Sequence, residues 1–360
     1  MSAPHRFAFA LALAAVLAAP AAAETPPRPQ FLPDGTVVVP SFRLPPSALA
    51  SPEARAFMKA RASLGTLPTQ VQDPDAARAR AALAAQLQPK VEQMLERYPV
   101  RVAETTLAGV PVREIVPAAG GEDAERVLVN LHGGAFTTCW ESCSLLESAP
   151  VAVTGRFRVI AVNYRMAPEA RHPAAVEDVA KVYRALLDRY PPTRIGIFGC
   201  SAGGNLTAQA AAWFARHQIP QPAAIGIFGA GGVRFGAGDS GYIAAYVDGS
   251  FPAPGPDGKP PFDITRGYFA GVAPGDPIAE PALHPELLAQ FPPALIITGT
   301  RAMDLSPAVV TNNALLAAGR ESTLVVGEGM GHCYLYSPEL PEAQQAYALI
   351  ARFFRRHLGG

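Results

Sequence analysis

Residues 194–203 read Arg-Ile-Gly-Ile-Phe-Gly-Cys-Ser-Ala-Gly, and a helix-compatible stretch follows from Asn205 to Arg216. The apolar run predicts a buried strand, so this part of the chain reads as strand, sharp turn and helix. In that context Gly199-Cys200-Ser201-Ala202-Gly203 is typical of a nucleophile elbow, where the residues two before and two after the serine must lack bulk. A chance pentapeptide is the alternative, because its residue types are common, and the rest of the chain has to decide.

Short apolar segments alternate with helical patterns through most of the chain. Buried strands are predicted at 127–131, 157–163, 194–198, 223–228, 294–298 and 323–326, helices at 174–190 and 341–357, and an antiparallel hairpin within 101–117. Alternating strands and helices predict an α/β fold with a mostly parallel central sheet flanked by helices. Ligands are then expected at the carboxyl ends of the strands.

The residues before this core divide into three parts. Residues 1–23 carry two basic residues, a short apolar run and small residues before Glu24, which predicts a signal peptide and export to the periplasm or medium. The apolar run is too short to span a membrane, so no stable insertion is expected after cleavage. Residues 24–100 are interpreted as a proline-rich arm followed by a cap of two helices, near 52–62 and 74–98. The catalytic domain is predicted over 101–360.

Composition excludes several classes of partner. The 360 residues include 30 basic and 30 acidic side chains and no basic run, so neither nucleic acid nor an anionic membrane is an expected partner. No cysteine or histidine spacing suggests a metal site. Among the four cysteines, Cys139 and Cys143 are predicted to form a disulfide if the loop bends, and Cys200 and Cys333 are predicted to be packing thiols.

One segment does not fit the alternation of strands and helices. Residues 229–274 are rich in glycine and proline and predict a long insertion. The insertion either borders a pocket or is a surface excursion without function, and the sequence favours neither.

A serine nucleophile needs donors for the developing oxyanion. His132-Gly133-Gly134-Ala135-Phe136 follows a predicted strand, and consecutive glycines allow backbone N–H groups to face an incoming oxygen. Gly133 and Gly134 are therefore predicted as donors, and the N–H of Ala202 as the third. His132 is interpreted as structural, holding the loop.

The base and the acid are expected later in the chain, in the order serine, acid, histidine. His332 lies in a loop after the last predicted strand and is the best placed histidine. Asp304 is the only carboxylate after the strand at 294–298 and is predicted to orient the imidazole. Asp276 is its main rival, and Asp304 could instead be a helix cap.

Together these motifs resemble the hormone-sensitive-lipase-like branch of the α/β-hydrolases, a group of bacterial esterases and acetyl-hydrolases. The resemblance covers roughly residues 100–360 and also rests on the segments 164–169, 172–178 and 328–332. It implies an α/β-hydrolase fold with an N-terminal helical cap, no cofactor, and a structural role for 164–169. Many members carry the acid two positions earlier, where this chain has Ala302, so either the loop shifts to bring Asp304 to the histidine or another carboxylate serves.

The resemblance implies a serine carboxylic-ester hydrolase acting on small-molecule esters with short- to medium-chain acyl groups. A homodimer is plausible for this branch. The alternatives are a hydrolase specialised for lactones, acetylated sugars or amides, and an exported binding protein of the same fold without turnover. The intact Ser201 and His332 argue against the last.

Overall fold

The computed structural model describes residues 28–61, 74–235, 237–248, 255 and 263–359. The chain divides into two compact units, residues 1–45 and 46–360. In the first unit, β1 (Gln30–Phe31) and β2 (Val37–Val38) form a short antiparallel pair. The predicted signal peptide lies outside the described residues. The second unit holds the large sheet and both helices of the predicted cap.

The centre of the second unit is an eight-stranded sheet with the order β10-β9-β8-β7-β5-β6-β4-β3. Its strands are β3 (Val100–Leu107), β4 (Val110–Pro117), β5 (Asp123–Leu131), β6 (Phe157–Val162), β7 (Ile195–Cys200), β8 (Ala224–Phe228), β9 (Ala294–Gly299) and β10 (Ser322–Gly327). The β3–β4 hairpin and the β4–β6 pair are antiparallel, and the other pairs are parallel. The predicted strands and hairpin are thus confirmed, and the sheet is mostly parallel.

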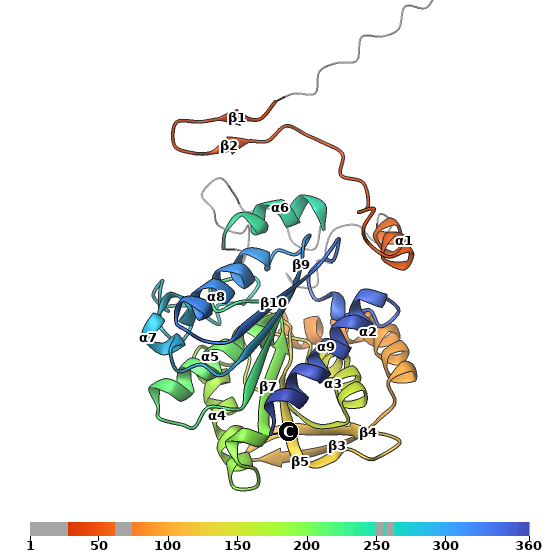
Figure 1. Cartoon of the computed structure of the whole chain (residues 1–360), viewed down its shortest axis with the longest axis vertical. Helices are drawn as coiled ribbons and strands as arrows, with labels where there is room; N and C mark the ends of the chain where they lie inside the picture. The colour runs from red at the N-terminus through yellow and green to blue at the C-terminus, as the bar shows by residue number, and fades with distance from the viewer. Residues whose placement is uncertain (1–27, 62–73, 236, 249–254, 256–262, 360) are drawn as a thin grey trace, which may run out of the picture. The chain divides into compact units, whose positions relative to one another are not determined.

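Helices cover both faces of the sheet (Figure 1). One face carries α4 (Ala174–Leu187), α5 (Ala202–Arg216) and α8 (Leu305–Ala317), and the other carries α3 (Trp140–Gly155) and α9 (Pro341–His357). Alternate residues of each strand enter different cores: Val127 and Val129 pack with α4 and α5, whereas Leu128 packs with α3 and α9. This alternation follows from the two-residue repeat of a strand buried on both faces.

Two elements differ from the sequence-based expectations. Helix α3 was not predicted, because it is buried on most sides and contains Pro150, so it lacks the apolar stripe of a surface helix. Strand β10 was predicted as buried but is partly exposed, because it lies at the edge of the sheet and pairs only with β9.

The two helices of the predicted cap, α1 (Pro52–Arg61) and α2 (Ala76–Arg97), pack on the α3 and α9 side of the sheet. From α2, Arg80 donates hydrogen bonds to the carbonyls of Thr137 and Ala167 and pairs with Glu169. Near α1, Ser47 donates to Glu328 at 2.6 Å. Helix α2 and the residues just before α1 therefore contact loops that follow strands of the sheet.

Candidate active site

The predicted site residues follow four different strands whose carboxyl ends meet at one edge of the sheet. Ser201 comes directly after β7, the loop 132–139 follows β5, Asp304 follows β9 and His332 follows β10. Together with β8, which lies between β7 and β9, these strands form consecutive parallel pairs, so their carboxyl ends point the same way. The sheet order thus brings together residues that are far apart in the chain.

The turn at Ser201 is a strained elbow. Ser201 has φ 59° and ψ −124°, a conformation that a residue with a side chain rarely adopts. A Cβ at Gly203 would collide with the carbonyl oxygen of Leu131, and a Cβ at Gly199 would collide with the same oxygen and with Gly203. The prediction that both flanking positions must lack bulk is confirmed, because the elbow packs directly against the end of β5.

Ser201, His332 and Asp304 form a chain of hydrogen bonds. His332 Nε2 lies 3.0 Å from Ser201 Oγ, and His332 Nδ1 lies 2.6 Å from Asp304 Oδ1. Asp304 is fully buried, and its Oδ2 accepts a hydrogen bond from Thr298 at 2.5 Å. Asp304 occupies the N-cap position of α8 but its side chain makes no capping bond. The carboxylate therefore orients the imidazole, an arrangement that lets Nε2 accept the serine proton.

The rival carboxylate lies elsewhere. Asp276 caps a turn by accepting hydrogen bonds from the N–H groups of Ile278 and Ala279, and it is 3.9 Å from His172 Nε2. The structure thus places Asp304, and not Asp276, against His332.

The loop after β5 requires a correction to the predicted oxyanion donors. The N–H of Gly133 donates to the buried carboxylate of Glu147 at 2.8 Å, so its single hydrogen is already engaged and Gly133 is not available as a donor. Among the described residues, none accepts a hydrogen bond from the N–H of Gly134, Ala135 or Ala202. At the end of β5, the Gly133 N–H points toward Glu147 on α3. The first N–H groups of this loop without an acceptor among the described residues are therefore those of Gly134 and Ala135.

His132 holds this loop, in keeping with the predicted structural role. Its ring is buried, stacks on Tyr164 at 4.3 Å between centroids, and places Nδ1 2.7 Å from the Gly133 carbonyl. Tyr164 in turn donates to the His132 carbonyl at 2.6 Å. Burial lowers the pKa of His132 to about 4, so the ring is neutral and acts as a packing group near neutral pH.

Comparison with known proteins shows the family of this chain. The model of the α/β-hydrolase fold family matches residues 128–336. The acetyl-hydrolase of Streptomyces hygroscopicus is 30% identical over 246 residues, which cover 65% of this chain and 77% of that protein. The chain belongs to the α/β-hydrolase family. It is an esterase-type serine hydrolase of the hormone-sensitive-lipase-like branch, as the resemblance implied.

Solved structures of α/β-hydrolases match over most of the chain. A crystal structure of an esterase named E25 superimposes with a TM-score of 0.74 at 26% identity, covering 89% of this chain and 98% of that one. An esterase of the bacterial hormone-sensitive lipase family gives a TM-score of 0.71 at 28% identity, with 86% and 99% covered. A shorter match, 36% identical, covers 31% of this chain and 30% of the arylacetamide deacetylase of Oryctolagus cuniculus.

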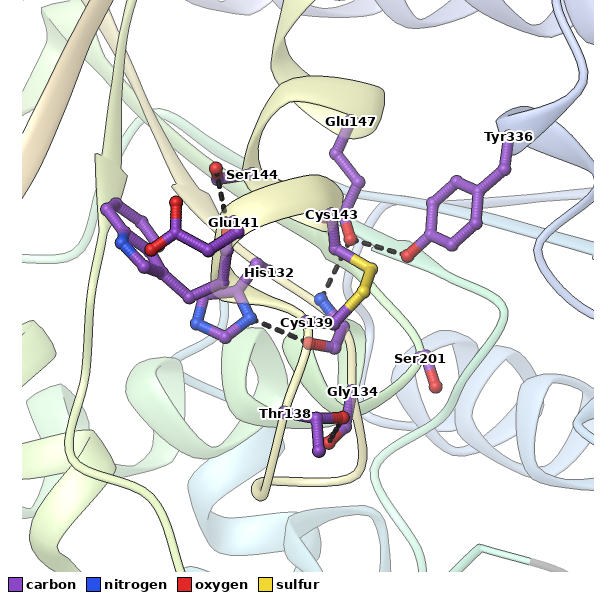
Figure 2. Close-up of a disulfide and its surroundings, with 12 residues drawn as sticks. His132, Gly134, Thr138, Cys139, Glu141, Cys143, Ser144, Glu147, Ser201 and Tyr336 are labelled. Carbon is purple, nitrogen blue, oxygen red and sulfur yellow. Dashed lines mark hydrogen bonds between the residues drawn. A yellow bond between two sulfur atoms is a disulfide. The ribbon is translucent and has the colours of Figure 1, made fainter. Parts of the chain in front are cut away.

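Glu147 is the site residue of this α/β-hydrolase that the sequence analysis missed. Its carboxylate lies between the loop after β5 and Tyr336, to which a dashed line joins it in Figure 2. A single acidic residue within the otherwise uncharged segment 142–155 was the available signal, since a buried charge needs a specific partner. Because no helix was predicted there, the sequence did not indicate which segments Glu147 contacts.

Burial gives Glu147 and His132 opposite effects on stability as pH changes. Burial raises the pKa of Glu147 to about 7 from its ordinary value of 4.5, against four hydrogen bonds that lower it. Its stabilising contribution is therefore present below pH 4.5 and is lost as pH rises through 7. The pKa of His132 is lowered from 6.5 to about 4, so its stabilising contribution is present above pH 6.5 and is lost as pH falls through 4.

We expect Glu147→Gln to remove only the first of these two effects. From about pH 4.5 to about pH 7.5, the free energy of unfolding of the variant should rise by about 3 kcal/mol relative to that of the unmodified protein, because the pKa of Glu147 is about 7 in the folded protein and 4.5 ordinarily. Urea unfolding at several pH values measures this difference. Glu141→Gln, which changes an exposed carboxylate of the same helix, is the control. Parallel pH curves for Glu147→Gln and the unmodified protein would contradict the assignment.

Two disulfides connect the loops of this α/β-hydrolase. Cys139–Cys143 spans the first turn of α3 beside the loop after β5, as predicted (Figure 2). Cys200 and Cys333 were predicted to be packing thiols, and this is wrong: they form a second disulfide across 133 residues. The pairing depends on the sheet, which brings the residue before Ser201 next to the residue after His332. The second disulfide therefore ties the elbow to the histidine loop.

The second disulfide should contribute more stability than the first. By the chain-entropy model, closing a loop of 133 residues stabilises by about 5 kcal/mol, and closing a loop of four by about 2 kcal/mol. Urea unfolding of Cys200→Ala/Cys333→Ala and of Cys139→Ala/Cys143→Ala, each against the unmodified protein, compares the two losses. Equal losses, or a larger loss for the local pair, would show that loop closure is not the main contribution.

The insertion at 229–274 contacts both sides of the site. On the side of Asp304, Ser240 in α6 (Asp239–Val247) donates to the Met303 carbonyl and exchanges hydrogen bonds with Ser306. On the other side, Tyr268 stacks on Phe136 of the loop after β5, at 4.6 Å between centroids. The described part of the insertion thus buttresses the loops that carry the site; residues 249–254 and 256–262 lie outside the described residues.

Among the described residues, no cluster of three or more His, Cys, Asp or Glu side chains is arranged to hold a metal ion. Nor does any helix in the described ranges combine the length and apolarity that a membrane span requires.

Proposed function

We propose that this chain is an exported serine carboxylic-ester hydrolase that acts on small-molecule esters with short- to medium-chain acyl groups. The observation that carries the proposal is the hydrogen-bonded chain from Ser201 through His332 to the buried Asp304. A serine hydroxyl is a weak nucleophile by itself, and this arrangement supplies both the base and the group that orients it.

In the proposed reaction, Ser201 Oγ attacks the ester carbonyl carbon while its proton moves to His332 Nε2. Asp304 holds the imidazole by its Nδ1–H and stabilises the imidazolium that forms. The tetrahedral intermediate then breaks its bond to the alkoxide oxygen, which takes the proton from His332 and leaves as an alcohol, and the acyl group stays on Ser201 Oγ. Water, deprotonated by His332, attacks the acyl carbon; the bond to Ser201 Oγ breaks, the carboxylic acid is released, and the proton on His332 returns to the serine.

The negative charge on the carbonyl oxygen needs preorganised donors. We assign this role to the N–H groups of Gly134, Ala135 and Ala202. Ala135 replaces Gly133, whose N–H donates to Glu147. Gly134 and Ala135 have φ of 111° and 55°, a backbone conformation that turns the loop sharply after β5. Ala202 is the first residue of α5, where the N–H has no partner within the helix.

Export is proposed from the signal-like sequence at residues 1–23, which lie outside the described residues. Two disulfides support it, because such bonds persist mainly in oxidising compartments. The short acyl preference is supported by the name of the acetyl-hydrolase relative. The name of the arylacetamide deacetylase relative supports amide hydrolysis as a second candidate activity.

The test is hydrolysis of p-nitrophenyl esters from acetate to palmitate and of p-nitroacetanilide, with protein beginning at residue 24. We expect the highest kcat/KM on short to medium acyl chains and labelling of the Ser201 peptide by a fluorophosphonate. A preference for the anilide would favour amide hydrolysis. Folded protein that neither turns over any ester nor accepts the label would refute serine-ester chemistry.

A further inference from the structure

The carboxylate of Glu147 accepts hydrogen bonds from donors on three separate segments. Gly133 N–H and the Tyr336 hydroxyl donate to Oε1 at 2.8 and 2.7 Å, and Asn130 Nδ2 and Cys200 N–H donate to Oε2 at 2.9 and 3.1 Å. All four donors are uncharged, and the side chain is buried. Each oxygen therefore accepts two hydrogen bonds, which is close to the capacity of an ionised carboxylate.

These donors lie next to the groups assigned to the reaction. Gly133 precedes Gly134 in the loop after β5, Cys200 precedes Ser201 in the elbow, and Tyr336 lies four residues after His332. The segments are also packed tightly, because a Cβ at Gly133 would come within 2.8 Å of the Tyr336 hydroxyl and 3.0 Å of the Cys200 carbonyl oxygen. The same Cβ would lie 3.3 Å from Ser201 Cβ.

We propose that Glu147 is a positioning residue of this esterase: its carboxylate holds the loop after β5 against the nucleophile elbow and thereby sets the Gly134 N–H relative to Ser201. The inference rests on the proposed function. Glu147 touches no substrate in this role. By accepting hydrogen bonds from Gly133 N–H and Cys200 N–H together, it fixes the peptides that come just before Gly134 and Ser201.

The position calls for a carboxylate and not for another side chain of similar size. A glutamine would place an NH₂ group against two of the four donors, so those hydrogen bonds would be lost or rearranged. A leucine would leave two buried backbone N–H groups without acceptors. Because oxyanion donors work only when preorganised at the correct distance, small displacements of Gly134 should act on the transition state more than on substrate binding.

The test compares Glu147→Gln, Tyr336→Phe and the control Glu141→Gln with unmodified protein on p-nitrophenyl acetate. For Glu147→Gln we expect kcat to fall by about 10- to 100-fold with KM within about threefold. A trifluoromethyl ketone adds to the serine and gives a tetrahedral oxyanion that resembles the transition state. The affinity of Glu147→Gln for this inhibitor should fall by a factor similar to the fall in kcat. Glu141 lies on the same helix but is exposed and pairs with Arg113, so its variant should retain kcat within about twofold.

Tyr336→Phe removes one of the four donors and leaves the carboxylate in place, so it tests the proposal even if Glu147→Gln does not fold. We expect a smaller fall in kcat, about three- to tenfold, again with KM nearly unchanged. Unchanged kcat in a folded Glu147→Gln variant, or in Tyr336→Phe where the first does not fold, would overturn the positioning role. If unmodified protein shows no Ser201-dependent turnover, the proposed function itself fails.

Discussion

Replacing Ser201 by alanine is expected to lower kcat for p-nitrophenyl acetate by about 10⁵- to 10⁶-fold. The physical reason is the loss of the nucleophile that His332 Nε2 contacts at 3.0 Å. The unengaged N–H groups of Gly134 and Ala202 would remain, so a small residual rate above that of water is expected. KM should change little, because the hydroxyl contributes more to the transition state than to binding.

The matched control is Ser322→Ala on β10, whose hydroxyl bonds to Asn312 away from the elbow. That variant should keep kcat within about twofold, since among the described residues the half-buried Ser322 hydroxyl bonds only to Asn312 and not to a residue of the site. Fluorophosphonate labelling gives an independent readout: the Ser201→Ala protein should take up no label, and the Ser322→Ala protein should be labelled fully. Retained turnover in Ser201→Ala would place the nucleophile elsewhere.

Asp304→Asn is expected to lower kcat by about 10³- to 10⁴-fold, a smaller loss than that of the nucleophile. An asparagine amide can donate to His332 Nδ1, which would put the ring proton on Nε2 and prevent it from accepting the serine proton. Asp304 is fully buried and contacts Nδ1 at 2.6 Å, so no water can easily replace it.

Asp276→Asn is the comparison that separates the two carboxylates. An asparagine oxygen can accept the same hydrogen bonds from the N–H groups of Ile278 and Ala279, so stability should change by less than about 1 kcal/mol and kcat should stay within about threefold. Kinetics on p-nitrophenyl butyrate together with urea unfolding distinguish loss of orientation from loss of stability. The reverse ranking of the two variants would mean that the histidine relies on a different acid.

Much of the fold could be predicted from the sequence, because the patterns that indicate strands, turns and helices are local. The apolar run at 194–198, the glycines around Ser201 and the helical pattern after them predict a strand, a turn and a helix from local sequence, although the glycines are required by packing against Leu131. The order serine, acid, histidine then favours Asp304 and His332, since each comes after a predicted strand, but it left Asp276 as a rival acid. The hairpin at 101–117 and the helix 341–357 follow from periodicity in the same way.

Tertiary structure decided the features that depend on contacts between distant segments. Helix α3 is buried on most sides, so its sequence has no apolar stripe to reveal a helix. The sequence therefore does not show which residues bond to Glu147. The Cys200–Cys333 bond exists only because β7 and β10 end at the same edge of the sheet. Whether Gly133 or its neighbours face an oxyanion depends on backbone dihedrals after β5, which local composition leaves open. The sequence by itself determined which residue types the chemistry uses and their order along the chain. The packing of separate strands decided that the Gly133 N–H bonds to Glu147 and that Cys200 and Cys333 form a disulfide.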